Sequence, residues 1–287
     1  MEIVNDAEAG RVTPALTGVP ETLLITLAAR VVAPMQNSDL CFVDPAAEQV
    51  GAALDFDPGR FSDDQASMRG TIVRAQWFDG AARRFMAKQP KGLVISIGSG
   101  LDTRANRIRP PAGMDWVDID FPEVTALRDK MVPRVERVRS LSADGTKIED
   151  WIQAVPWNPA RPTLVMAEGV SMYLTSLQAI DWLQGLVSAA SSRKSRMTLA
   201  LDLASPLMVS QSHRHPSVSR TTARFHWGVR RPEEVCQLAK GLLLTESYDV
   251  AAHSGTASRI AAAIYRVVTL GRPIYSCALF EYGSPLK

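Results

Sequence analysis

Cysteine, net charge and long hydrophobic runs are all scarce in this chain of 287 residues. The three cysteines, Cys41, Cys236 and Cys277, lie far apart and form no C-x-x-C pair, so we expect a reducing compartment, no disulfide framework and no metal site of the structural zinc type. The net charge of +2 gives no reason to expect binding to nucleic acid or to a membrane surface. No apolar run reaches the ~20 residues of a membrane span, and the acidic residues 1–10 lack the pattern of a signal peptide. These absences predict a cytoplasmic protein.

The character of the sequence changes near Pro90. Before it, the patterns predict helices: residues 22–30 contain no breaker, Pro34 is expected to end that helix, residues 44–45 resemble a helix start, and residues 71–86 have helical spacing. After it, short apolar runs alternate with helical stretches, and the strand candidates are Leu93–Ile97, Asp115–Ile119, Val135–Ser140, Thr163–Ala167, Met197–Asp202, Leu243–Tyr248 and Ile274–Phe280.

This alternation predicts a doubly wound α/β fold, Rossmann-like, with a mostly parallel sheet. Only residues 251–271 separate the last two strand candidates, which favours an antiparallel edge strand. We expect a helical N-terminal cap over residues 1–90 and an α/β domain over residues 91–287.

The most informative segment is ISIGSGLDTR, residues 95–104, where an apolar strand breaks at a glycine turn and passes into a helix start. Gly98 and Gly100 let the backbone approach a ligand where a Cβ would collide. Asp102 and Thr103 are placed to cap the first N–H groups of the helix. The turn predicts a cofactor with an adenosine-like part.

A second signal is VDIDFPEV, residues 117–124, in which Asp120 falls at the end of the next strand. An acid there accepts hydrogen bonds from ribose hydroxyls. A dinucleotide site would want a third glycine where Thr103 stands, and the acid Asp102 is unfavourable beside a pyrophosphate. S-adenosyl-L-methionine carries no phosphate and suits the turn better, whereas an NAD(P)-dependent oxidoreductase stays open as an alternative.

A third signal is AEGVSMYL, residues 167–174, where an apolar strand ends in an acid. Ligands of open α/β sheets lie beyond the carboxyl ends of the strands, so we expect Glu168 to face a cation or an ammonium group. Tyr173 either lines a sulfonium pocket, where an aromatic face favours a cation, or belongs to the core.

Together these three segments resemble the leucine carboxyl methyltransferase family, and within it the bacterial polyketide O-methyltransferases typified by the tetracenomycin carboxyl methyltransferase. The resemblance covers most of the chain and extends to AAR at residues 28–30, DPA at 44–46, IVRAQWFD at 72–79 and FHWG at 225–228. It implies a class I S-adenosylmethionine-dependent methyltransferase.

The resemblance also implies roles for single residues. Arg74, and with it Arg30, matches basic residues that hold the carboxylate of the cofactor. Gly98 matches the glycine beside the methionine part, Asp120 the ribose-binding acid, Asp144 the acid that contacts adenine, and Glu168 the acid near the methionyl amino group. In two places the chain departs from the family pattern: Gly145 stands where an apolar residue is frequent, and Ser99 where alanine is.

Residues 203–232, where the family inserts a lid, contain no acid but five arginines and three of the four histidines. Such a lid would attract an anionic substrate, with Arg214, Arg220 and Arg224 as its predicted ligands; a solvated loop is the alternative. His226 is the best candidate for a general base, and His213 and His215 have no carboxylate nearby in sequence to complete a metal site.

A carboxylate is already ionised near pH 7 and needs alignment rather than a base, whereas a phenol would benefit from one. The sequence therefore predicts methylation of a carboxylate on a small acidic metabolite of secondary metabolism. The alternatives are a phenol or hydroxyl acceptor, the C-terminal carboxylate of a protein, and a non-catalytic cofactor-binding protein on the same fold.

Overall fold

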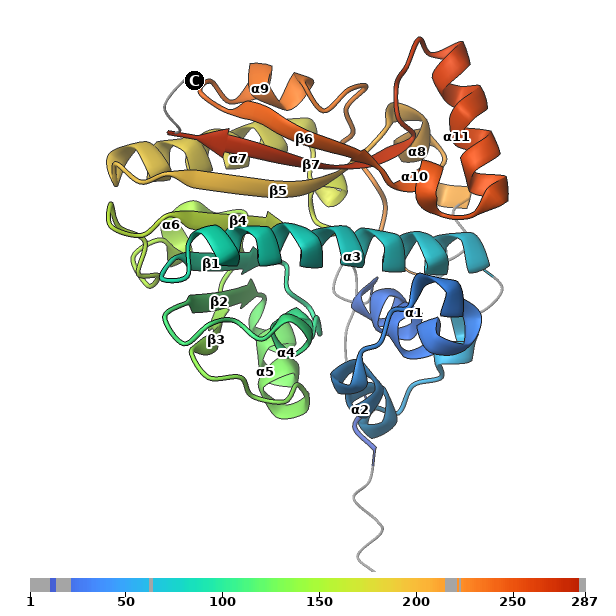
Figure 1. Ribbon diagram of the computed structural model, residues 1–287, viewed down its shortest axis with the longest axis horizontal. Coiled ribbons are helices and arrows are strands. Elements are labelled where there is room, and N and C mark those ends of the chain that lie inside the picture. The colour runs from blue at the N-terminus through green and yellow to red at the C-terminus, as the bar shows by residue number, and fades with distance from the viewer. Residues whose placement is uncertain (1–10, 14–21, 62–63, 215–220, 222, 284–287) are drawn as a thin grey trace, which may run out of the picture.

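A seven-stranded sheet forms the centre of the molecule, in the order β3-β2-β1-β4-β5-β7-β6 (Figure 1). The computed structural model describes residues 11–13, 22–61, 64–214, 221 and 223–283. The strands are β1 (Leu93–Ile97), β2 (Asp115–Asp120), β3 (Val138–Ser142), β4 (Thr163–Ala167), β5 (Met197–Ala204), β6 (Leu243–Asp249) and β7 (Tyr275–Tyr282). Strands β1 to β5 pair in parallel, and β7 is antiparallel to both β5 and β6. The predicted α/β fold is confirmed, with its antiparallel strand in the terminal pair.

Helices cover both faces of this sheet, which is why its central strands are apolar throughout. The α-helices are α1 (Leu23–Gln36), α2 (Pro45–Ala53), α3 (Gln65–Lys88), α4 (Arg104–Ile108), α5 (Pro122–Met131), α6 (Ile148–Trp151), α7 (Ser176–Ser192), α8 (Pro206–Ser210), α9 (Glu234–Leu238), α10 (Val250–His253) and α11 (Thr256–Val268). Short 3-10 helices are η2 (Ser38–Leu40), η3 (Pro58–Phe61), η4 (Ser171–Tyr173) and η5 (Ser212–Arg214).

The core separates along the alternation of β1. Leu93, Ile95 and Ile97 pack with Trp182 and Leu186 of α7 in one cluster. On the other side of the strand, Val94 packs with α3, which runs across the sheet in Figure 1. A third cluster joins α1, α2 and the first half of α3 to the glycine turn. The N-terminal helices are therefore packed directly against the segment that carries the cofactor motif.

Two local predictions were wrong. Pro34 lies inside α1 rather than ending it, because a proline in the last turn removes only one helical hydrogen bond. Thr103 is the N-cap residue of α4 but makes no capping hydrogen bond, since its hydroxyl donates to Asp44 instead. Asp102 does accept from the backbone N–H of Arg104 at 3.1 Å. The predicted cap at Asp44 and Pro45 is confirmed, with Asp44 accepting from the N–H of Ala47.

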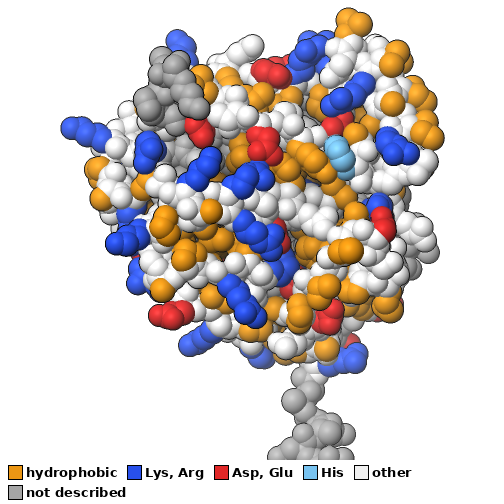
Figure 2. All heavy atoms as spheres, viewed as in Figure 1, with side chains coloured by type: hydrophobic (Ala, Val, Ile, Leu, Met, Phe, Trp, Pro, Cys, Tyr) orange, Lys and Arg blue, Asp and Glu red, His pale blue; other side chains and the backbone are white. Residues whose placement is uncertain are grey.

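Helix α11 stands at a corner of the molecule and turns an apolar face away from it. Ala262 on its inner side is buried, whereas Ile260, Ile264, Val267 and Val268 are exposed. Figure 2 shows these apolar side chains at the upper right, with basic side chains beside them. No helix in the described part of the chain is both long enough and apolar enough to cross a membrane.

Candidate cofactor and acceptor site

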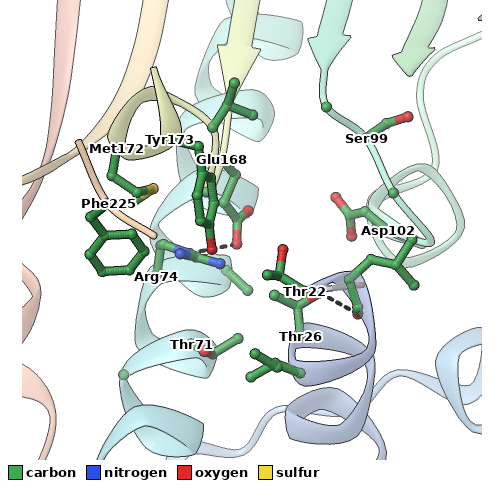
Figure 3. Close-up of a pocket in the computed structure, with 18 of the residues that line it drawn as sticks. Thr22, Thr26, Thr71, Arg74, Ser99, Asp102, Glu168, Met172, Tyr173 and Phe225 are labelled. Atoms are coloured by element: carbon green, nitrogen blue, oxygen red, sulfur yellow. Dashed lines mark hydrogen bonds and ion pairs between the residues drawn. The ribbon is translucent and has the colours of Figure 1, made fainter. Parts of the chain in front are cut away.

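A cavity of ≈ 600 Å³ opens at the carboxyl ends of β1, β2 and β4, with α1 and α3 on its other side (Figure 3). Its size is within the range of small-molecule sites. The residues that line it include all seven predicted for the cofactor, namely Arg30, Arg74, Gly98, Gly100, Asp120, Asp144 and Glu168, and also Tyr173. The structure thus brings together side chains that lie up to 143 positions apart in the sequence.

The glycine turn needs its glycines for conformation and for space. Gly98 and Gly100 have φ values of +63° and +50°, in the left-handed region that a Cβ disfavours. A Cβ on Gly98 would also lie 2.4 Å from Cγ2 of Val170, in the turn that follows β4. The turn therefore packs tightly against the third predicted cofactor segment, residues 167–174.

Asp120 at the end of β2 fixes the turn from below. Its Oδ2 accepts from the N–H of Gly100 at 2.7 Å, and its Oδ1 accepts from the N–H of Phe121 at 2.8 Å. Burial raises the pKa of Asp120 above its ordinary value, and these two backbone hydrogen bonds oppose the shift. Each oxygen keeps a second lone pair for a ribose hydroxyl.

Arg74, in α3, projects its guanidinium toward the cavity (Figure 3). Its Nε donates to Glu168 Oε1 at 2.9 Å, and its Nη1 donates both to Asp202 Oδ2 at 3.0 Å and to the hydroxyl of Tyr275 at 2.7 Å. Among the described residues, nothing accepts a hydrogen bond from Nη2. That nitrogen is available to an anion in the cavity.

Glu168 is shared between two arginines. Its Oε1 accepts from Arg74, and its Oε2 accepts from Nη2 of Arg104. Gly169, which follows it, has a φ of +70° and donates its N–H to Asp202 at 2.9 Å. The two arginines thereby hold the acid at the cavity wall, where an ammonium group could meet it.

Arg30 lines the cavity, but all three of its guanidinium nitrogens donate hydrogen bonds to the glycine turn or to α1. Its Nη1 donates to Asp102 at 3.0 Å, its Nη2 to the carbonyl of Leu101 at 3.2 Å, and its Nε to the carbonyl of Thr26 at 3.1 Å. This geometry braces the glycine turn from α1 and leaves Arg74 as the better placed anion ligand.

Asp144 lies beyond β3 and lines the same cavity. Its Oδ1 accepts from the N–H and the hydroxyl of Thr146, at 3.0 and 2.6 Å. Gly145 has a packing reason: a Cβ there would lie 2.4 Å from Cγ2 of Ile97. The departure from the family pattern at this position brings the Asp144 loop close to β1.

A buried ionic network behind the turn escaped sequence reasoning. Arg104 donates to Asp79, Asp102 and Glu168, and Arg107 donates to Asp44 and Asp79. Burial alone would raise the pKa of Asp102, but the arginines lower it well below its ordinary value. All of these acids lie in the motif strings quoted above. Only the fold, however, shows which arginines they meet.

Away from the glycine turn, one wall of the cavity is apolar and a threonine hydroxyl lies opposite it. Met172, Tyr173, Phe225 and Met208 form the apolar wall, and Thr71 of α3 faces it. The Tyr173 and Phe225 rings meet edge to face at 5.3 Å. Burial raises the pKa of Tyr173, with an opposing hydrogen bond to the side chain of Thr22.

Of the side chains predicted to act from the lid, those of Arg224 and His226 are described, and neither is in this wall. His226 and Arg224 have exposed side chains and do not line the cavity, whereas Phe225 between them points inward. The alternation follows from backbone pairing, in which the N–H groups of residues 226 and 227 both donate to the carbonyl of Met172. Arg224 donates to the carbonyls of Thr221 and Ala223. Arg220 and the side chain of Arg214 lie outside the described residues, as does His215.

Two of the predicted cofactor-binding side chains keep hydrogen-bonding capacity at the cavity. Nη2 of Arg74 has no acceptor among the described residues, and each oxygen of Asp120 keeps a second lone pair. The hydroxyl of Ser99 is buried within the turn and has no hydrogen-bond partner among the described residues. The residues present therefore fit a ligand with an amino acid at one end and a nucleoside at the other.

Comparison with known proteins agrees with this geometry. A sequence profile of the leucine carboxyl methyltransferase family matches residues 24–187. The tetracenomycin polyketide synthesis O-methyltransferase TcmP of Streptomyces glaucescens is 32% identical over 235 residues, which make up 82% of this chain and 84% of that protein. A putative S-adenosyl-L-methionine-dependent methyltransferase of Frankia alni is 29% identical over 209 residues, or 67% of this chain and 71% of that one.

Solved structures share the fold at lower identity. A DUF574 family protein of Streptomyces avermitilis has a TM-score of 0.55 and 16% identity, covering 89% of this chain and 97% of its own. A putative methyltransferase of Thermobifida fusca has a TM-score of 0.53 and 15% identity, covering 89% and 94%. These two likenesses concern the fold alone.

The glycine turn by itself allowed a nicotinamide-dependent oxidoreductase, and the family match excludes that alternative. The cofactor is S-adenosyl-L-methionine, as the combination of Asp102, Asp120 and Glu168 predicts. The chain belongs to the leucine carboxyl methyltransferase family and is an S-adenosyl-L-methionine-dependent methyltransferase.

Proposed function

We propose that the protein methylates a carboxylate on a small aromatic metabolite and releases a methyl ester. One observation carries this proposal: the described residues that line the cavity include no histidine, lysine or cysteine. The carboxylates that line it already accept hydrogen bonds: Asp102 and Glu168 from arginines, Asp120 from backbone N–H groups, and Asp144 from Thr146. An acceptor that is already ionised needs no base, and a carboxylate meets that condition near pH 7.

The cofactor residues divide the cavity into two ends. In this proposal Asp120 and Asp144 hold the ribose and the adenine, while Glu168 and Arg74 hold the ammonium and carboxylate of the amino acid. When bound, S-adenosylmethionine supplies a methyl group activated by its sulfonium charge. The acceptor then occupies the apolar end beside Tyr173. The aromatic face of Tyr173 favours the positive charge of the nearby sulfonium group.

Alignment and exclusion of water are the chain's contributions to the transfer. Met172, Tyr173 and Phe225 form a wall against which a planar acceptor can stack. The hydroxyl of Thr71 faces that wall as a hydrogen-bond donor for an acceptor oxygen. Holding two reactants in line replaces an entropic cost that otherwise amounts to several kcal/mol, roughly 7–11 in the best cases.

The relatives and the lid add support. TcmP is named for O-methylation in polyketide synthesis, which is consistent with an aromatic acceptor and with secondary metabolism. We still predict that Arg214 and Arg220, in a lid spanning residues 203–232, bind the charge of the acceptor. Arg224 instead donates to the carbonyls of Thr221 and Ala223 in its own loop. His226 and Tyr173 stay predictions as catalytic groups, and the cavity geometry favours Tyr173.

The deciding experiment offers the enzyme matched acceptors that differ in the reacting group. Naphthoic acid and naphthol are incubated separately with isotopically labelled S-adenosylmethionine, and the products are identified by mass spectrometry. We expect label on the acid only, and we expect mild alkali to release it as methanol because esters hydrolyse and aryl ethers do not. Labelling of naphthol alone would instead make the protein a phenol O-methyltransferase.

A further inference from the structure

Asp202 and Tyr275 meet Arg74 at the base of the cavity, although neither belongs to the cofactor motifs. Asp202 lies near the end of β5 and is 0% exposed. Tyr275 begins β7, the antiparallel strand that pairs with β5. The Tyr275 hydroxyl donates to Asp202 Oδ2, and both groups accept a hydrogen bond from Nη1 of Arg74. The three side chains therefore form a closed triangle.

Every side-chain polar atom of this triangle except Nη2 of Arg74 has a hydrogen-bond partner. Both N–H groups of Arg74 Nη1 are used, one by each partner, and its Nε is used by Glu168. Asp202 Oδ1 accepts from the N–H of Gly169, and its carbonyl accepts from the hydroxyl of Ser171. Burial raises the pKa of Tyr275 well above its ordinary value, so the hydroxyl keeps the proton that it donates. Only one rotation of the planar guanidinium satisfies all of these partners.

That rotation presents Nη2 to the cavity. An arginine side chain loses considerable rotamer freedom when it is fixed, and a group that is fixed in advance binds an anion with a smaller entropic cost. Asp202 also fixes the Gly169 turn, so the same carboxylate orients the arginine and the backbone next to Glu168. The alternative is that the pair only satisfies buried polar groups between β5 and β7.

We propose that Tyr275 and Asp202 are positioning residues that fix Arg74 with its Nη2 edge toward the amino-acid carboxylate of the cofactor. The inference rests on the role proposed for Arg74 and extends the cofactor site to the C-terminal strand β7. Neither residue touches the cofactor in this arrangement; both act through the guanidinium.

The test compares two ligands that differ only in the carboxylate: S-adenosylhomocysteine and its decarboxylated form. Binding of each is measured by calorimetry to the full-length protein and to Tyr275→Phe, which keeps the ring and removes the hydroxyl. We expect roughly tenfold weaker binding of S-adenosylhomocysteine, the size of a lost hydrogen bond to a charged group, and a less than twofold change for the decarboxylated ligand. We also expect a higher KM for S-adenosylmethionine with kcat nearly unchanged.

Two further variants separate the possible failures. Arg74→Lys should weaken S-adenosylhomocysteine selectively; equal weakening of both ligands would refute the role of Arg74 itself. If Arg74→Lys is selective but Tyr275→Phe weakens both ligands equally, or neither, the positioning role is overturned and the role of Arg74 stands. Tyr248→Phe in β6 is the matched control, since its ring stacks on His253 and does not line the cavity, and it should leave both affinities unchanged. Asp202→Asn should reproduce the selectivity if it folds, and Tyr275→Phe decides the question if it does not.

Discussion

At the scale of single residues, the predicted cofactor site depends on Asp120, a buried carboxylate in which each oxygen accepts a hydrogen bond. Asp120 accepts one backbone N–H group on each oxygen, from Gly100 and Phe121, and lines the cavity. Burial dominates its pKa, whereas several guanidinium groups around Asp102 lower the pKa of that acid. Two acids of one site are thus driven in opposite directions by their neighbours.

This difference predicts how cofactor binding depends on pH. Because burial raises the pKa of Asp120 above 3.8, the carboxyl becomes protonated at a higher pH than an exposed aspartate and then loses acceptor capacity. We expect the affinity for S-adenosylhomocysteine to fall on acidification while the pH is still above 3.8. Calorimetric titrations over a pH series would measure it.

Asp120→Asn supplies the comparison. It should bind S-adenosylhomocysteine more weakly at neutral pH, and its affinity should vary less with pH because position 120 no longer titrates. Parallel pH profiles for the two proteins would mean that another group causes the dependence. The ligand's own titration is the same in both series and cancels.

Stability also falls in acid through Asp102, although the pKa of Asp102 is shifted in the opposite direction to that of Asp120. A lowered folded-state pKa contributes stability that is present above the unfolded value of 3.8 and is lost as the pH falls through the folded value. The arginines around Asp102 therefore stabilise the glycine turn at neutral pH, where the enzyme has to bind its cofactor.

Most residues that we propose for the cofactor could be predicted from the sequence, because each follows a strand or belongs to a specific string. Their partners were not. Tyr275 and Asp202 come together only because β7 inserts between β5 and β6, a pairing that no local pattern encodes. An acid inside the apolar run of residues 197–202 was the one available signal.

At the scale of elements, the glycine turn makes a quantitative prediction. Gly98→Ala should lower the free energy of unfolding by about 2–4 kcal/mol, combining the cost of a left-handed alanine with overpacking against Val170. Urea denaturation would measure the change.

Gly271→Ala separates the two contributions. Gly271 also has a positive φ, +92°, but a Cβ there would meet nothing within 4 Å. Its cost should be only the ~1–2 kcal/mol of backbone strain. Adding Val170→Ala to Gly98→Ala should recover part of the excess; no recovery would show that the clash is relieved by some other movement.

The predicted strand bounds match the observed ones where a strand is fully buried and differ where a strand is partly exposed. Leu93–Ile97 and Thr163–Ala167, buried at every position, were predicted to the residue. The third strand was expected at residues 135–140 and lies at Val138–Ser142, because its half-exposed residues give a weaker pattern. Register at such an edge is set by pairing with β2, which a single segment does not reveal.

At the scale of the whole molecule, the outer face of α11 carries four of the exposed large apolar side chains of the described residues. Ile264 and Val268 are 60% and 75% exposed, so replacing both with lysine removes little buried area. We expect the free energy of unfolding to change by less than about 0.5 kcal/mol for each, and concentration-dependent light scattering to decrease.

Leu177→Lys serves as the control, since Leu177 is equally exposed on α7 but lies outside the α11 face. It should change neither quantity. A marked loss of stability in the α11 variants would show that another chain or segment covers this face in solution.

The helical region before Pro90 and the sheet domain after it are joined by the buried ion pairs around Arg104. Asp79 in α3 and Asp44 at the start of α2 meet arginines of α4, and Arg30 of α1 meets Asp102. If the first 90 residues were exchanged for those of a relative, Arg104, Arg107 and Asp102 would each lose the partner that they have in this chain. Removing one member of a buried pair costs about 3–5 kcal/mol, so a chimera whose new N-terminal helices lack these partners would destabilise the glycine turn.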